Sequence, residues 1–216
     1  MCQMSQADIN NWGMGGIAAA ALLRRQSCTF TGHRSKKLPW KSDEVAPDCI
    51  ALKALLAERI AALAENGVVH FLTGGSDGID LYATEAVLEL REHNPAIKRL
   101  CILPCREQAG RWPVAPKKRY NAVLEQADAI VYVSQSYHEN CMLERNRFMV
   151  QLSSVVLAVY NGEKRGGTAA TVRYARRMGR DLLVIDPTTL TLTHEEAVYD
   201  DCGRRILLSQ SGRRPM

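Results

Sequence analysis

The chain has 216 residues, of which 46% are hydrophobic and 24% are charged, and its formal net charge at pH 7 is +5. This length fits one α/β domain better than two, and its core is large enough that folding requires neither a metal ion nor a disulfide. The mild basic excess suits a phosphate-bearing partner, but it does not by itself single out nucleic acid.

Residues 1–26 are predicted to be an N-terminal appendage outside the main fold, with a composition that suits a short helix. The apolar segment at residues 12–23 is shorter than the roughly 20 residues that a membrane span requires. Arg24 and Arg25 follow this segment, whereas a signal peptide carries its positive charge before the apolar run. We therefore expect no membrane partner.

The seven cysteines lie at positions 2, 28, 49, 101, 105, 141 and 202, and no two of them have Cys-x-x-Cys spacing. No second Cys/His pair with zinc-ligand spacing accompanies Cys101 and Cys105. We therefore expect reduced thiols in a cytoplasmic protein, with neither a metal site nor a cofactor.

Six short apolar runs follow one another from Cys28 onward: CTFT, VVHFLT, RLCILP, AIVYVS, VVLAVY and LLVID. Their apolar residues are continuous, which is typical of strands buried on both faces of a parallel sheet. Helical patterns separate them at residues 48–67, 78–93, 116–128, 141–152 and 168–179, and Asp48 is the expected N-cap of the first.

This alternation predicts an α/β fold, a Rossmann-like doubly wound and mostly parallel sheet of about six strands with helices on both faces. The domain is expected to span residues 27–187. Residues 188–216 have no clear pattern and are expected to be a C-terminal extension. The sequence leaves the assembly of several copies into a homo-oligomer open.

Glycines, hydroxyls, amides or arginines follow five of the predicted strands. In open parallel sheets, ligands bind outside the carboxyl ends of the strands, and these ends lie on one rim. The loop after the first strand contains Thr31, Gly32, His33 and Arg34, of which Arg34 makes an anion contact plausible. The alternative for His33 is a buried, hydrogen-bonded core histidine.

The segment TGGSDGID at residues 73–80 favours backbone amides that approach a phosphate at the start of a helix, with Ser76 among them. It lacks both the G-x-G-x-x-G spacing and the lysine of a P-loop. The alternative is a plain strand-to-helix turn in which Asp77 caps the helix and Asp80 lies in its first turn.

The segment GEKRGGT at residues 162–168 is a second candidate phosphate loop, in which Thr168 starts a helix; the alternative is a flexible charged loop with an N-cap. Trp112 is predicted either to stack on a base or to pack half-buried. Arg145 and Asn146 lie within a predicted helix, where a solvated charged face is the alternative to an anion and sugar contact.

Six motifs, in this order, resemble the YpsA-like group of the SLOG superfamily: FTGHR, TGGSDGID, ILPCREQAGRW, RYNAVLEQADAIVYVSQSY, ERNRFMVQLSSVVLAVYNGEKRGGTAATVRYA and LLVIDP. The superfamily also contains lonely-guy cytokinin hydrolases, DprA recombination mediators and sensor domains of antiphage systems. The resemblance implies a nucleotide-like ligand at the rim. It implies contacts from Gly32, Arg34, Gly74, Gly75, Asp77, Gly78, Arg106, Gln108, Trp112, Arg145, Asn146, Gly166, Gly167 and Thr168.

The hydrolase branch carries the motif P-G-G-x-G-T-x-x-E, and the window that aligns with it here is residues 165–173. Gly166 and Gly167 retain the phosphate-binding glycines, but Arg173 replaces the glutamate. An arginine stays protonated and cannot supply a carboxylate to an oxocarbenium-like centre. Another carboxylate, such as Asp77, Asp80 or Glu85, would have to substitute.

Three functions follow as hypotheses. The leading one is a module that binds a nucleotide or a nucleotide-derived phosphate ligand, as a sensor or a sequestering protein, without catalysis. The second is a nucleotide N-glycosidase. The third and less favoured is DNA binding of the DprA type, for which the cations are Lys117, Lys118, Arg119, Arg173, Arg176, Arg177 and Arg180.

Overall fold

A computed structural model of the chain describes residues 2–5, 21–199 and 205–210. These residues form one nine-stranded sheet with the strand order β1-β5-β4-β3-β2-β6-β7-β8-β9. The strands are β1 (Cys2–Ser5), β2 (Ser27–Gly32), β3 (His70–Thr73), β4 (Lys98–Leu103), β5 (Ala129–Tyr132), β6 (Val155–Val159), β7 (Asp181–Ile185), β8 (Leu192–Tyr199) and β9 (Arg205–Gln210).

The predicted fold class is confirmed. All neighbouring pairs from β1 to β7 are parallel, and only the β7–β8 and β8–β9 pairs of the described sheet are antiparallel. The six apolar runs form β2 to β7. Residues 2–5 add β1 beside β5, within the segment expected to lie outside the fold, and the segment after residue 188 contributes β8 and β9. The division of the chain into three segments stays a prediction.

Within the described residues, five helices connect the strands from β2 to β7: α3 (Pro47–Glu65), α4 (Ile79–His93), α5 (Val114–Glu125), α6 (Cys141–Gln151) and α7 (Gly167–Arg177). The predicted N-cap of α3 is wrong by two positions. The cap is Ala46, so that Pro47 occupies the first turn, where its missing N–H costs nothing, and Asp48 lies near the positive end of the helix dipole.

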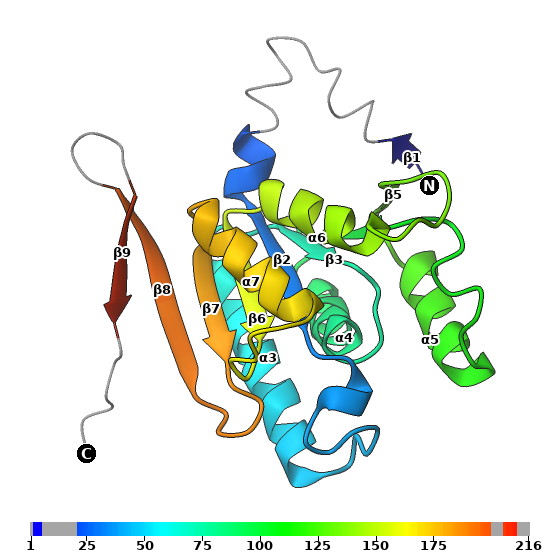
Figure 1. Ribbon diagram of the computed structural model, residues 1–216, viewed down its shortest axis with the longest axis horizontal. Coiled ribbons are helices and arrows are strands. Elements are labelled where there is room, and N and C mark those ends of the chain that lie inside the picture. The colour runs from blue at the N-terminus through cyan, green and yellow to red at the C-terminus, as the bar shows by residue number, and fades with distance from the viewer. Residues whose placement is uncertain (1, 6–20, 200–204, 211–216) are drawn as a thin grey trace.

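The helices cover both faces of the sheet, with α6 and α7 on one face and α3 and α4 on the other (Figure 1). Leu52 and Leu56 of α3 pack with Phe71 of β3 in one buried cluster. On the opposite face, Phe148 of α6 packs with Ile102 of β4. Each fully buried side chain of this size contributes about 1.5–3 kcal/mol of transfer free energy. Among the described helices, none is both long and apolar enough to cross a membrane.

The strand order reverses at β2. From β2 the chain adds β3, β4 and β5 on one side, and it then returns to place β6 and β7 on the other side of β2. The carboxyl ends of β2 and β6 therefore flank a topological switch point, where the two crossovers leave in opposite directions. Ligands of doubly wound folds bind in the crevice at this position.

Candidate functional site

A cleft of about 330 Å³ lies at this switch point, and the loops after β2 and β6, the start of α4 and one side of α6 line it. The structure brings predicted residues from four separate segments to the cleft. They are Thr31, Gly32, His33, Arg34, Ser76, Arg145, Asn146, Gly166, Gly167 and Thr168. The remaining predicted residues lie behind this lining or elsewhere.

The amino end of α7 forms one wall of the cleft. Gly166 is its N-cap with φ of 108°, and no side chain of the described residues caps the helix. The N–H groups of a first helical turn have no intrahelical acceptor, and the helix dipole adds positive potential there. A Cβ on Gly166 would meet no described atom within 4 Å. This wall therefore presents open space beside N–H donors, which is the geometry of an anion site.

Three side-chain contacts join the loop after β2 to the loop after β6. The Thr168 hydroxyl donates to the Gly32 carbonyl over 2.9 Å, and the His33 Nε2–H donates to Asn161 Oδ1 over 3.0 Å. Lys37, which ends the 3-10 helix η1 (Ser35–Lys37), pairs with Glu163 Oε2 at 2.7 Å. These two loops form the lips of the cleft, and the contacts that join them connect residues more than a hundred positions apart.

Arg145 and Asp80 form the floor. Arg145 is 5% exposed, and its Nη2 donates to the Ser76 hydroxyl over 3.4 Å. Its Nη1 lies 4.0 Å from Asp80 Oδ2, beyond hydrogen-bond reach, and neither Nη1 nor Nε has a hydrogen-bond partner among the described residues. A buried guanidinium with unpaired donors is costly unless a ligand or water satisfies it.

Burial has opposite effects on these two groups. It raises the pKa of Asp80, an effect that the charge of Arg145 and the Ser76 N–H oppose, and it lowers the pKa of Arg145. Both shifts disfavour the charged forms of these side chains. An anion bound beside Arg145 would again favour the charged form of its guanidinium.

Two backbone amides of the 74–78 loop donate to acceptors within the protein. The Gly75 N–H donates to Thr73 Oγ1 over 3.2 Å, and the Ser76 N–H donates to Asp80 Oδ2 over 3.1 Å. These donors already have acceptors within the protein. The phosphate role expected for this loop stays a prediction, whereas open space adjoins the amino end of α7.

Packing supplies another reason for glycine in this loop. A Cβ on Gly74 would overlap the Arg145 guanidinium, and a Cβ on Gly78, which has φ of 89°, would lie 2.6 Å from the His33 carbonyl oxygen. Asp77 does not line the cleft. The N-cap of α4 is Gly78, and no side chain of the described residues caps this helix, so the capping alternative for Asp77 is wrong.

Three predicted residues after β4 lie outside the cleft lining. Gln108 is 7% exposed, and its Nε2 donates to the Gly74 carbonyl over 3.0 Å, which supports the loop from behind. Trp112 packs edge-on against Tyr120 with ring centroids 5.2 Å apart. The Arg106 guanidinium lies 4.5 Å from the centre of the Tyr132 ring. Their ligand-binding roles stay predictions.

Asn146 connects the floor to the α7 wall. Its Nδ2 donates to Thr171 Oγ1 over 2.9 Å, and the Thr171 hydroxyl donates to the Gly167 carbonyl over the same distance. The amide of Asn146 thereby fixes the first turn of α7 as well as lining the cleft.

Arg173, which replaces the hydrolase glutamate, is exposed and does not line the cleft. Its Nη1 donates to the Lys164 carbonyl over 2.8 Å, so it holds the loop before α7. Of the three carboxylates considered as substitutes, Asp80 lines the cleft, whereas Glu85 pairs with Arg119 on the surface.

The cleft also contains residues outside the predicted set: Phe30, Lys36, Lys37, Asp80, Met142, Met149, Glu163 and Arg165. A signal for two of them exists in the sequence. Met142 and Met149 lie three residues before and four residues after Arg145, and this spacing places them on the same helix face. Within the described residues, no group of three or more His, Cys, Asp and Glu side chains could hold a metal ion.

Comparison with known proteins gives a family and a fold. The model of YpsA, described as the YspA SLOG family, matches residues 28–190. A UPF0398 protein, BH1768 of Halalkalibacterium halodurans, is 30% identical over 156 residues, covering 69% of this chain and 82% of the relative. A UPF0398 protein of Bacillus pumilus is 33% identical over 148 residues, covering 67% and 78%.

Two solved structures share the fold. DNA processing protein A (DprA) of Streptococcus pneumoniae superposes with a TM-score of 0.51 at 17% identity, over 76% of this chain and 52% of that one. DprA of Helicobacter pylori, whose structure concerns single-stranded DNA binding, superposes with a TM-score of 0.52 at 21% identity, over 77% and 68%. This chain thus corresponds to about half of the first DprA chain.

Proposed function

We propose, from the premise that this chain belongs to the YspA SLOG family, that its cleft binds a nucleotide or nucleotide-derived ligand through a phosphate group. The observation that supports this most is the buried guanidinium of Arg145, whose Nε and Nη1 have no described partner on the floor of the cleft. The amino end of α7 provides a second, independent source of positive potential in the same hollow.

The proposed ligand lies with a phosphate against the N–H groups of Gly167 and Thr168. Its uncharged part lies along the apolar side of the cleft, where Phe30, Met142 and Met149 provide a polarisable surface for a base. The role that this arrangement supports is that of a sensor or a sequestering module, because the motif glutamate of the hydrolases is an arginine here.

A thermal-shift screen with nucleoside mono- and diphosphates and cyclic nucleotides tests this proposal. A ligand present at 100 times its dissociation constant should stabilise the protein by about 2.7 kcal/mol. The Arg145→Met variant should lose most of the shift, whereas Arg177→Gln, which removes an exposed cation of α7 outside the cleft lining, should keep it. The absence of stabilisation by every nucleotide would refute the proposal.

A nucleotide N-glycosidase is the second candidate, because one carboxylate, Asp80, lies on the floor of the cleft. Asp80 would have to stabilise positive charge on the ribose in place of the missing glutamate. Incubation with AMP and CMP and detection of the free base distinguish the two functions. Base release that Asp80→Asn abolishes would favour the enzyme over the binding module.

DNA binding of the DprA type is the third candidate, favoured by the fold alone. Several of the cations expected to contact DNA are engaged within the protein: Arg119 with Glu44 and Glu85, and Arg176 with Glu195. Single-stranded DNA binding should weaken by about 0.7 log unit per log unit of salt for each phosphate contact. Absence of binding at low salt would remove this candidate.

A further inference from the structure

The cleft continues outward as a shallow groove along the loop before α7. Lys37, Glu163, Lys164, Arg165 and Gly166 line this groove, and all of them except Lys164 also line the cleft. The two hollows therefore adjoin each other. The amino end of α7 lies at their common boundary, because Gly166 belongs to both linings.

The groove is strongly cationic. Lys37, Lys164 and Arg165 line it, and Lys36 lines the adjoining part of the cleft, while Glu163 is the only carboxylate among the described residues of the groove lining. Glu163 does not neutralise this cluster, because it pairs with one cation, Lys37, at 2.7 Å. Like charges gathered in one hollow repel one another unless an anion enters.

We propose that this groove is a second phosphate subsite, that the ligand carries at least two linked phosphates, and that the Glu163 carboxylate occupies the subsite in the free protein. The proposal rests on the proposed function, which places the first phosphate at the amino end of α7. A phosphate linked to the first would leave the cleft across Gly166 and reach Lys37 and Arg165.

Glu163 then acts as an internal competitor. Its contact with Lys37 is partly exposed, with side-chain exposures of 49% for Lys37 and 39% for Glu163. A pair of this kind contributes at most a few-fold to an equilibrium, so that a doubly charged phosphate can displace it. The same exchange would leave the Thr168–Gly32 and His33–Asn161 hydrogen bonds in place.

Calorimetric titration with AMP and ADP, and with inorganic phosphate and pyrophosphate, tests the proposal. ADP should bind about tenfold more tightly than AMP, which corresponds to one additional charge-assisted phosphate contact. The double variant Lys37→Gln/Arg165→Gln should remove this advantage, so that it weakens ADP binding by a much larger factor than AMP binding. Glu163→Gln should strengthen ADP binding by up to about fivefold, because Lys37 no longer has an internal partner.

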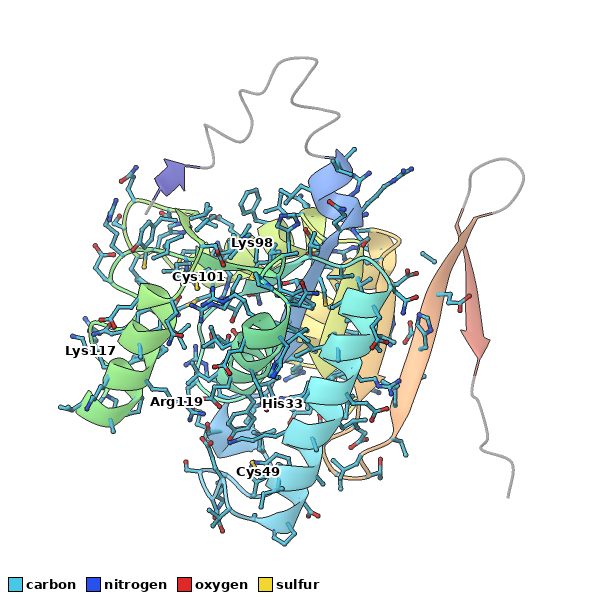
Figure 2. All side chains as sticks on the ribbon, turned by 180° about the vertical axis from the view of Figure 1, so that it is seen from behind. His33, Cys49, Lys98, Cys101, Lys117 and Arg119 are labelled. Atoms are coloured by element: carbon cyan, nitrogen blue, oxygen red, sulfur yellow. The ribbon has the colours of Figure 1, made fainter. Side chains whose placement is uncertain are left out.

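The matched control is Lys117→Gln/Lys118→Gln, which makes the same change in net charge on exposed residues of α5. Lys117 lies on the outer part of α5, away from His33 (Figure 2). This control should retain the tenfold preference. Loss of the preference in the control would show that net charge alone causes it and would overturn the subsite.

Equal binding of AMP and ADP by the wild-type protein would overturn the second subsite and leave the proposed function standing. So would a Lys37→Gln/Arg165→Gln variant that weakens AMP and ADP by the same factor. If none of the four probes binds, the proposed function fails and the second subsite fails with it.

Discussion

The guanidinium of Arg145 occupies the space that a side chain on Gly74 would need. A Cβ built at Gly74 overlaps Nη1 of Arg145, although the two residues lie on different elements, the loop after β3 and the helix α6. The glycine therefore determines where the buried cation of the cleft floor lies.

Gly74→Ala is expected to displace Arg145 and to lower the free energy of unfolding by about 1–3 kcal/mol, the usual cost of overpacking a filled site. Phosphate-ligand binding should weaken at the same time. Urea unfolding and thermal-shift measurements check both effects. In an Arg145→Ala background the same substitution should cost much less, and equal costs in the two backgrounds would contradict the steric explanation.

Thr168→Val is expected to lower the free energy of unfolding by about 1 kcal/mol, because the hydroxyl that donates to the Gly32 carbonyl is lost. Thr168→Ser retains the donor and should behave like the wild type. Urea unfolding compares the three proteins, and amide hydrogen exchange shows whether the 162–168 loop opens more often. A Ser variant as unstable as the Val variant would argue against the hydrogen bond.

Arg173→Ala is expected to loosen the loop before α7, since it removes the donor to the Lys164 carbonyl. Hydrogen exchange of residues 162–168 should rise, and ligand affinity should fall by about fivefold, the loss of roughly 1 kcal/mol. Arg177→Ala removes the same charge from the same helix without this contact, and it should change neither quantity. Equal effects of the two variants would indicate a general charge effect.

Asp80 should make stability fall as pH rises above the usual range of an aspartate. Burial raises the pKa of Asp80 in the folded protein, so the unfolded chain ionises first as pH increases. The stability contributed by the protonated form is full below the ordinary aspartate pKa, and it is lost as pH rises through the folded value.

Urea unfolding of the wild type and Asp80→Asn between about pH 3.5 and pH 7 measures this linkage. The free energy of unfolding of Asp80→Asn, relative to the wild type, should increase with pH across this window. A relative stability that decreases with pH would mean that Arg145 and the Ser76 N–H outweigh burial.

Continuous apolar runs predict β2 to β7 because strands covered on both faces need apolar side chains at every position. The other strands lack this signal. Strand β1, with the sequence CQMS, is polar at two of its four positions. Strand β8 carries His194, Glu195 and Glu196 at the antiparallel end of the sheet, where such polar residues are compatible with a solvated face. Strands at an edge of this kind are recognised from their partners rather than from their own composition.

The candidate site was predictable to the extent that it depends on topology. Because the carboxyl ends of parallel strands lie on one rim of the sheet, Gly32, Arg34 and Gly167 are expected to lie together. The structure places all three in one cleft. The directions of individual groups depend on tertiary contacts. The Gly75 and Ser76 amides donate to Thr73 and Asp80 within the protein, which a glycine pattern does not reveal.

The contacts between the two lips of the cleft affect the rate at which a ligand is expected to bind. Because the Thr168–Gly32 and His33–Asn161 hydrogen bonds are made within the protein and need no ligand atom, the receptive geometry is preformed, and little ordering entropy remains to be lost on encounter. Capture should therefore proceed in one bimolecular step whose observed rate rises in proportion to ligand concentration, without the plateau that a slow rearrangement would impose.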